Sequence, residues 1–147
     1  MPTTPPGSSS WPRTFFVGKT EGHGVLTKIV SHQATVTVRG SGRIDSAGAL
    51  ILDQTVSKSR SATKMREWRL IEGPPGSFTG TLTDAAGAVT GLVRGNDFHV
   101  RYRMKGGIQV DQHLMLQPGG RTILNQMTFR KFGVAVAHMR ETINHAG

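Results

Sequence analysis

The stretch FHVRYRMKGGIQVDQHLML, residues 98–116, decides the fold. From Phe98 to Met104 apolar side chains alternate with basic ones. Successive side chains of a strand point to opposite faces of a sheet, so this alternation indicates a strand with one buried face. Gly106-Gly107 then supplies the backbone freedom of a tight turn, and residues 108–116 return as a second strand. The stretch therefore predicts an antiparallel β-hairpin.

The rest of the chain repeats this pattern of short segments separated by turn residues. Gly, Pro, Asn and Asp recur between the segments, and each favours a turn for a known conformational reason. Further strands are predicted over residues 24–30, 33–39, 49–56, 64–71, 77–83, 88–94, 122–129 and 134–139. About ten short strands joined by tight turns indicate an all-β antiparallel barrel or sandwich. We favour the barrel, because a sheet that closes on itself leaves no unpaired edge.

The two ends of the chain follow the pattern less clearly. Residues 1–13 are rich in Pro, Ser and Thr, so we expect a flexible tail followed by a single domain over residues 14–147. The tail lacks the apolar core of a secretory signal, which favours a cytoplasmic protein. Near the other end, Ala135–Ile143 shows a weak helical periodicity, which leaves a short terminal helix open as an alternative to a strand.

Composition excludes several classes of protein. The chain has 147 residues, which suits one domain, and it has no cysteine, which excludes disulfides, thiolate zinc sites and a cysteine nucleophile. No apolar run is long enough to cross a bilayer. Lys and Arg total 18 against 9 acidic residues, a net charge of +9. Such a charge favours anionic partners, although a solvated basic surface is the simpler interpretation.

Short motifs stand in a distinctive order along the chain. They are FVGKTEGHGV at residues 16–25, REWRL at residues 66–70, FTG at residues 78–80, and Asn125 followed by KFGV at residues 131–134. Their order and spacing, over residues 16–139, resemble a family of small uncharacterised bacterial proteins. The family is a domain of unknown function, often lipid-anchored. The resemblance implies a lipocalin-like, calycin-type barrel, and it implies no established activity.

The chain departs from the family pattern at several positions. His113 stands where the family usually has Trp, Gln54 where it has Glu, and Phe129 where it has Met. The cysteine that carries the lipid is missing, so membrane anchoring is not expected to carry over. The resemblance adds Gln54 to the polar positions expected to contact a ligand.

Asn125 is a polar residue in an apolar pattern. It is in phase with Ile123, Met127 and Phe129, so it is expected on the buried face of its strand. A buried amide without partners costs about 1–3 kcal/mol, so this position needs a reason. Two interpretations remain open: a structural hydrogen bond to a neighbouring turn, or an amide that orients a ligand inside the barrel.

Two further pairs of side chains each share a strand face. Arg66 lies on the same face as Trp68, and Asp111 lies on the same face as His113. If Arg66 and Asp111 met inside the barrel, they would form a polar network suited to a carbonyl or carboxylate group. The tentative catalytic set is therefore Arg66, Asp111 and His113. The alternative places all of them on the outer surface, because charged residues are seldom buried unless paired.

The first motif contributes a third candidate pair, Glu21 and His23. In a barrel these residues could cap one end of the cavity and contact a ligand, although a polar rim is the simpler interpretation. The chain has six histidines, but none has helical metal spacing, so neither a metal site nor a cofactor is predicted. No phosphate loop or nucleophile elbow is present. The basic strand face lacks exposed aromatic neighbours, which disfavours nucleic-acid binding.

Three functional hypotheses therefore compete. The first is a binding module, monomeric or homodimeric, whose cavity holds an apolar or amphipathic small molecule. The side chains expected to line this cavity are Phe98, Tyr102, Met104, Leu114 and Leu116, with Trp68 and Asn125. The second is a cofactor-free isomerase, cyclase or lyase that works inside the barrel. The third is a binder of nucleic acid or another anionic surface. The direction in which the charged side chains point separates the first two.

Overall fold

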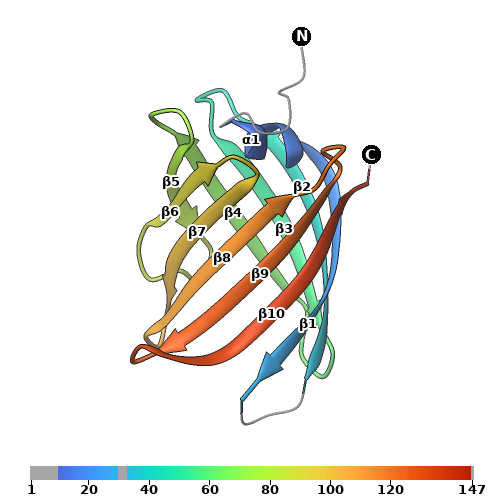
Figure 1. Cartoon of the computed structure of the whole chain (residues 1–147), viewed down its shortest axis with the longest axis vertical. Helices are drawn as coiled ribbons and strands as arrows, with labels where there is room; N and C mark the ends of the chain where they lie inside the picture. Colours follow the sequence, from blue (N-terminus) through green and yellow to red (C-terminus); the bar gives the residue numbers. More distant parts are fainter. Residues whose placement is uncertain (1–9, 30–32, 147) are drawn as a thin grey trace.

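Ten antiparallel strands close into a barrel in the computed structural model of the chain, which describes residues 10–29 and 33–146 (Figure 1). The strands are β1 (Gly18–Lys28), β2 (Ala34–Ile44), β3 (Leu50–Lys58), β4 (Lys64–Glu72), β5 (Ser77–Leu82), β6 (Val89–Arg94), β7 (Asp97–Met104), β8 (Ile108–Leu116), β9 (Thr122–Lys131) and β10 (Val134–His145). Each strand pairs with the next one along the chain, and β10 pairs with β1 to close the sheet. This confirms the predicted antiparallel barrel, and the hairpin over residues 98–116 is β7 and β8.

The C-terminal segment is a strand, so the alternative of a terminal helix is wrong. In β10 the side chains of Ala137, Met139, Glu141 and Ile143 are buried and those between them are exposed. This period of two is that of a strand with one face in the core. The inward carboxylate of Glu141 interrupts the apolar alternation, which is why the strand was expected to end at residue 139.

A short helix, α1 (Trp11–Phe15), lies across one end of the barrel. Pro12 occupies the start of the helix, where its fixed φ and missing N–H are tolerated. Trp11 is only 1% exposed; its Nε1 donates a hydrogen bond to the carbonyl of Gly95 at 3.0 Å, and its ring packs edge-on against Phe98. The expected boundary after residue 13 therefore falls inside α1. Residues 1–9 of the expected tail lie outside the described residues.

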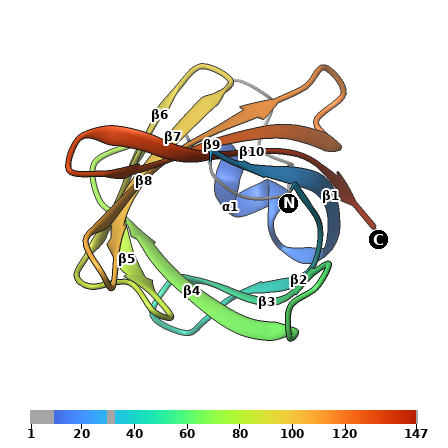
Figure 2. The ribbon, with the colours of Figure 1, turned by 90° about the horizontal axis from the view of Figure 1, so that it is seen from below.

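The opposite end of the barrel is formed by turns. The connections between β3 and β4, β7 and β8, and β9 and β10 all lie there (Figure 1). Figure 2 looks along the barrel from this end, with α1 lying across the far end. We call this turn-lined end the open end. Among the described residues, no helix is long and apolar enough to cross a membrane.

Candidate functional site

A cavity of about 200 Å³ occupies the interior of the barrel. Its wall runs from Phe16, next to α1, to Lys58 and Lys64 at the open end. Most of the wall is apolar, and the volume exceeds the ~150 Å³ that accommodates a benzene ring in an apolar protein interior. Six of the seven predicted lining residues are part of this wall: Trp68, Phe98, Tyr102, Met104, Leu114 and Asn125. Leu116, on the same strand face, is buried in the core.

A chain of polar side chains crosses the wall formed by β8, β9 and β10. Gln112 Nε2 donates to Asn125 Oδ1 at 3.3 Å, and Asn125 Nδ2 donates to Glu141 Oε1 at 2.9 Å. Asn125 is 3% exposed, which confirms its predicted inward position. Its partners are side chains of the neighbouring strands, and not a turn. Gln112 Oε1 and Glu141 Oε2 have no hydrogen-bond partner among the described residues. The row of hydrogen-bonded side chains therefore has an unsatisfied oxygen at each end.

Glu141 is a buried carboxyl group that sequence reasoning missed. Burial raises its pKa, and the hydrogen bond from Asn125 and the charges of His23 and Arg66 oppose that increase only in part. Gly22 on the adjacent strand β1 leaves room for the group, because a Cβ at this position would overlap the Glu141 carboxylate. The carboxyl group therefore keeps its proton to a higher pH than an exposed glutamate does, and in its protonated form it can donate a hydrogen bond.

A second polar group lies on β3, β4 and β7. Trp68 Nε1 donates to Gln54 Oε1 at 2.7 Å, and the guanidinium of Arg66 lies 5.6 Å from the centroid of the Trp68 ring. The ring of Tyr102 meets Trp68 edge-on. Arg66 Nε and Nη2 and the Tyr102 hydroxyl are buried without a hydrogen-bond partner among the described residues. Burial raises the pKa of Tyr102, and the charge of Arg66 and the approach of its guanidinium to the hydroxyl oppose the rise, although the two groups form no hydrogen bond of ordinary geometry.

The two polar groups face each other across the cavity. In the strand order of the closed barrel, β4 and β9 lie on opposite sides (Figure 2). All of the side chains concerned belong to the cavity wall: Gln54, Arg66, Trp68, Tyr102, Gln112, Asn125 and Glu141. Since Arg66 also lowers the pKa of Glu141 through its charge, the two sides interact across the space that a ligand would fill.

Asp111 and His113 lie on the outer face of β8, so the predicted interior pair of Arg66 and Asp111 is wrong. Gln112, between them, is the residue that points inward. Asp111 instead contacts Arg101 at 3.0 Å and Arg130 at 2.7 Å on the outer surface. Burial alone would raise the pKa of Asp111, but hydrogen bonds and charges from His99 and Arg101 hold it below its ordinary value.

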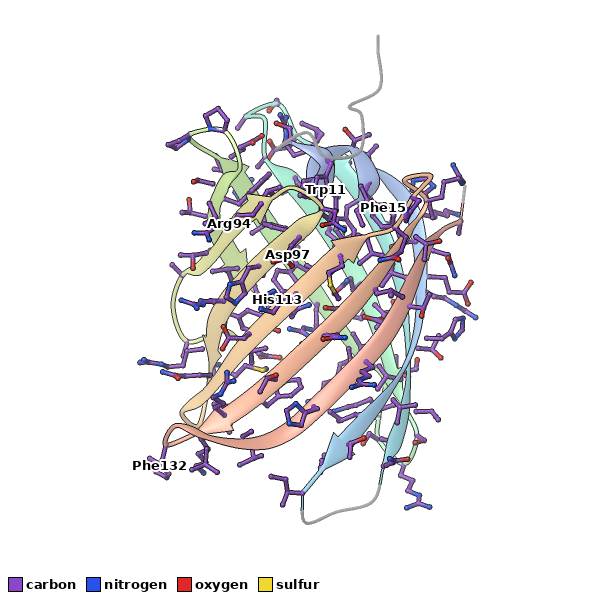
Figure 3. All side chains as sticks on the ribbon, viewed as in Figure 1. Trp11, Phe15, Arg94, Asp97, His113 and Phe132 are labelled. Atoms are coloured by element: carbon purple, nitrogen blue, oxygen red, sulfur yellow. The ribbon has the colours of Figure 1, made fainter. Side chains whose placement is uncertain are left out.

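His113 has its own outer partners. Its Nδ1 lies 3.1 Å from Asp97 on β7, a strand beside β8 (Figure 3), and its ring stacks on His99 with centroids 4.0 Å apart. The tentative catalytic set is therefore divided by the barrel wall, with Arg66 inside and Asp111 and His113 outside. Among the described residues, no cluster of His, Asp and Glu has the arrangement of a metal site.

Glu21 and His23 also point outward, which corrects their expected place at the cavity. His23 is exposed and Glu21 is half-buried, and His23 Nε2 lies 3.3 Å from Glu21 Oε1. On β1 the inward positions belong to Thr20 and Gly22, one residue out of phase with this pair. The ligand-contacting positions that remain inside from the sequence analysis include Gln54, Trp68 and Asn125.

The chain belongs to the family described as "Protein of unknown function (DUF3833)", whose sequence model matches residues 8–145. This confirms the family membership expected from the motifs. No curated protein sequence matches the chain.

Solved structures with a similar backbone include the S-type phycobiliprotein lyase CPES from Guillardia theta, with a TM-score of 0.72 and 7% identity over 93% of this chain and 90% of the lyase. A protein of unknown function from the DUF3598 family of Nostoc punctiforme has a TM-score of 0.66 and 14% identity, over 91% of this chain and 49% of that protein. EF1p2_mFAP2b bound to DFHBI has a TM-score of 0.50 and 10% identity, over 94% and 98%. At these identities the similarity establishes the fold, a lipocalin-like barrel.

Proposed function

We propose that this protein binds an amphipathic small molecule inside the barrel, with an oxygen-bearing polar group held at Arg66. The observation that carries the proposal is the set of unsatisfied polar atoms in the cavity wall, among them Arg66 Nε and Nη2 and the Tyr102 hydroxyl. An unpaired buried polar group costs about 1–3 kcal/mol, and more when it is charged. Water can satisfy these atoms in the empty barrel, but a ligand that displaces the water must replace its hydrogen bonds.

The chemistry of the wall defines the ligand class. Arg66 and Tyr102 offer donors, and Glu141 offers another when it holds its proton. Donors on several sides suit an acceptor such as a carboxylate, which a guanidinium binds with two parallel hydrogen bonds. The remaining apolar wall suits a short hydrocarbon or a ring. One barrel of similar fold is named a phycobiliprotein lyase and another was solved with DFHBI bound, which fits a cavity that takes small molecules.

Binding of decanoate and decanol, followed by fluorescence of Trp68 in the cavity wall, tests the proposal. Both probes have the same alkyl chain, and only decanoate carries the acceptor group. We expect decanoate to bind about 10–100-fold more tightly, the equivalent of one charge-assisted hydrogen-bonded pair. Arg66→Met should abolish this preference and leave decanol binding unchanged. Arg39→Met, on the exposed outer face of β2, is the matched control and should retain the preference. Equal binding of the two probes to the unmodified protein would refute the proposal.

One observation favours a second candidate, a cofactor-free isomerase, cyclase or lyase. A carboxyl group with a raised pKa in an apolar cavity is a good general acid, and Glu141 is such a group. The working groups would then be Glu141, Arg66 and Asn125, in place of Asp111 and His113. Purified protein should be extracted and the released compounds identified by mass spectrometry. If the protein is an enzyme, the Glu141→Gln variant should still bind the compound but no longer convert it. If it only binds the compound, both the unmodified protein and the variant should release it unchanged.

A further inference from the structure

Phe132 is an exposed aromatic residue in a tight turn, a position where an aromatic side chain contributes neither to folding nor to solubility. It lies at the tip of the turn between β9 and β10 and is 92% exposed (Figure 3). Its φ is 51° and that of Gly133 is 77°, so both central residues of this two-residue turn have positive φ. Turns of this kind favour Asn-Gly, because Asn adopts positive φ more easily than a bulky residue does. The turn thus carries both backbone strain and exposed apolar surface.

Two other exposed apolar side chains belong to the same open end. Val134 begins β10 just after the turn, and Ile29 follows the end of β1. The N–H of Ile29 donates to the carbonyl of Val136 at 3.2 Å, which fixes Ile29 beside the start of β10. Phe132 lies at the end of the molecule opposite Trp11 and Phe15 (Figure 3), and Val134 and Ile29 belong to strand ends at the same end.

The same end of the barrel is strongly basic. Its turns and strand ends carry Lys28, Lys58, Arg60, Lys64, Lys105 and Lys131. Among the described residues none of these lysines has an ion-pair partner, and Asp84 is the acidic residue that lines the cavity at this end. Lys58 is partly desolvated beside Lys64 and Lys28, and burial and these neighbouring charges lower its pKa.

The end that carries α1 differs in charge pairing. There Arg13 lies 4.0 Å from Glu72, and Arg69 Nη1 lies 2.6 Å from Asp45 Oδ2. Cations without an ion-pair partner therefore cluster around the open end, where a negatively charged surface would relieve the repulsion among the lysines.

We infer that the open end of the barrel docks on an anionic lipid membrane. Phe132, Val134 and Ile29 enter the headgroup region, and the surrounding lysines face the lipid phosphates. Separate apolar side chains on turns suit the soft interface of a bilayer, whereas a protein partner would need a continuous complementary patch. The cavity wall reaches Lys58 and Lys64 at the same end, so a ligand of the class proposed above could pass between lipid and barrel. Only this last statement rests on the proposed function.

Co-sedimentation of the full chain with lipid vesicles tests the inference. One set of vesicles is phosphatidylcholine alone, and the other contains phosphatidylglycerol as the anionic lipid. We expect binding to the anionic vesicles that weakens as salt is added. Phe132→Asn should reduce the affinity by roughly 10–100-fold, the value of burying one large apolar side chain. The same variant should melt at the same or a higher temperature, because Asn-Gly relieves the turn. An effect on binding alone excludes misfolding as the cause.

Charge is tested with the double variant Lys58→Gln, Lys64→Gln. It should lose roughly fivefold per lysine on anionic vesicles. The controls are Leu92→Ser, at an exposed apolar residue of β6, and Arg121→Gln, in the connection between β8 and β9 at the α1 end (Figure 1). Both variants should bind as the unmodified protein does. The inference is overturned if the unmodified protein ignores anionic vesicles, if Phe132→Asn binds normally, or if Arg121→Gln weakens binding as much as the lysine variants. It is also overturned if an oligonucleotide competes fully and Phe132→Asn leaves oligonucleotide binding intact.

The decanoate titration without vesicles separates this inference from the proposed function. Phe132→Asn should bind decanoate as the unmodified protein does, because Phe132 is not part of the cavity wall. Failure of vesicle binding with normal decanoate binding would refute the docking surface alone.

Discussion

Replacing Glu141 with Gln should stabilise the protein at neutral pH and have little effect in acid. The two side chains have nearly the same shape, and the Gln carbonyl can still accept the hydrogen bond that Asn125 donates at 2.9 Å. What changes is the ionisation. The folded state raises the pKa of Glu141 above its ordinary value of 4.5, so the folded protein holds the proton more tightly than the unfolded chain. The ionised carboxylate of Glu141 therefore destabilises the folded state, and the Gln variant lacks this cost.

The direction with pH follows from this difference in proton affinity. Below pH 4.5 both states are protonated and the unmodified protein has its full stability. As the pH rises through the folded pKa, the unfolded chain releases its proton first and stability is lost. Each tenfold difference in proton affinity corresponds to about 1.4 kcal/mol, so the gap between variant and unmodified protein at neutral pH reports the size of the pKa increase.

Urea unfolding followed by tryptophan fluorescence, across the acid to neutral range, measures this gap. Glu67→Gln is the matched control, because Glu67 is an exposed carboxylate on the outer face of β4, away from the cavity. The control should show no comparable gap. A gap for Glu141→Gln that stays constant with pH would mean that packing, and not ionisation, is the cause. A gap that closes as the pH rises would refute the reasoning outright.

Two further predictions concern the other polar residues. Asn125→Leu should lower the free energy of unfolding by about 1–3 kcal/mol in urea titrations, because Glu141 loses its only hydrogen-bond donor among the described residues; unchanged stability would contradict the buried position of the amide. Arg66→Met and Asp111→Asn should have additive effects on the urea midpoint, because the barrel wall separates the two side chains. Non-additive effects would show that they are coupled.

The sequence was sufficient for the architecture because each strand alternates clearly. The period of two from Phe98 to Met104 is maintained by apolar residues on every inward position, and the glycine turn leaves one way to pair the strands. The inward direction of Asn125 followed from the same rule. The position of Asp111 was also readable, since Val110 and Leu114 are the apolar positions of β8 and Gln112 is in phase with them. The possible charge pairing with Arg66 favoured an inward Asp111, but the alternation of apolar residues along β8 places Asp111 outside.

Other features depend on contacts that no local pattern reveals. The helix α1 is five residues long, which is too short to show a helical periodicity. Its position depends on the hydrogen bond from Trp11 to Gly95, which is distant in the sequence. Glu141 was missed because a carboxylate at an inward position looks like the end of a strand. Its burial becomes understandable only with Asn125 and Gly22 on the strands to either side, and that neighbourhood is a product of the closed barrel.

The opposition of Arg66 and Glu141 across the cavity implies that ligand and proton bind together. Arg66 is one of the charges that keeps the pKa of Glu141 from rising further. A carboxylate bound to Arg66 would cancel that charge and place a negative group in the same low-dielectric space, so it would raise the pKa of Glu141 again. Linkage is reciprocal, and the protonated form of Glu141 must therefore bind the carboxylate more tightly than the ionised form does. On the proposed function, the barrel holds an acidic ligand best when the buried carboxyl carries its proton, and ionisation of Glu141 favours release.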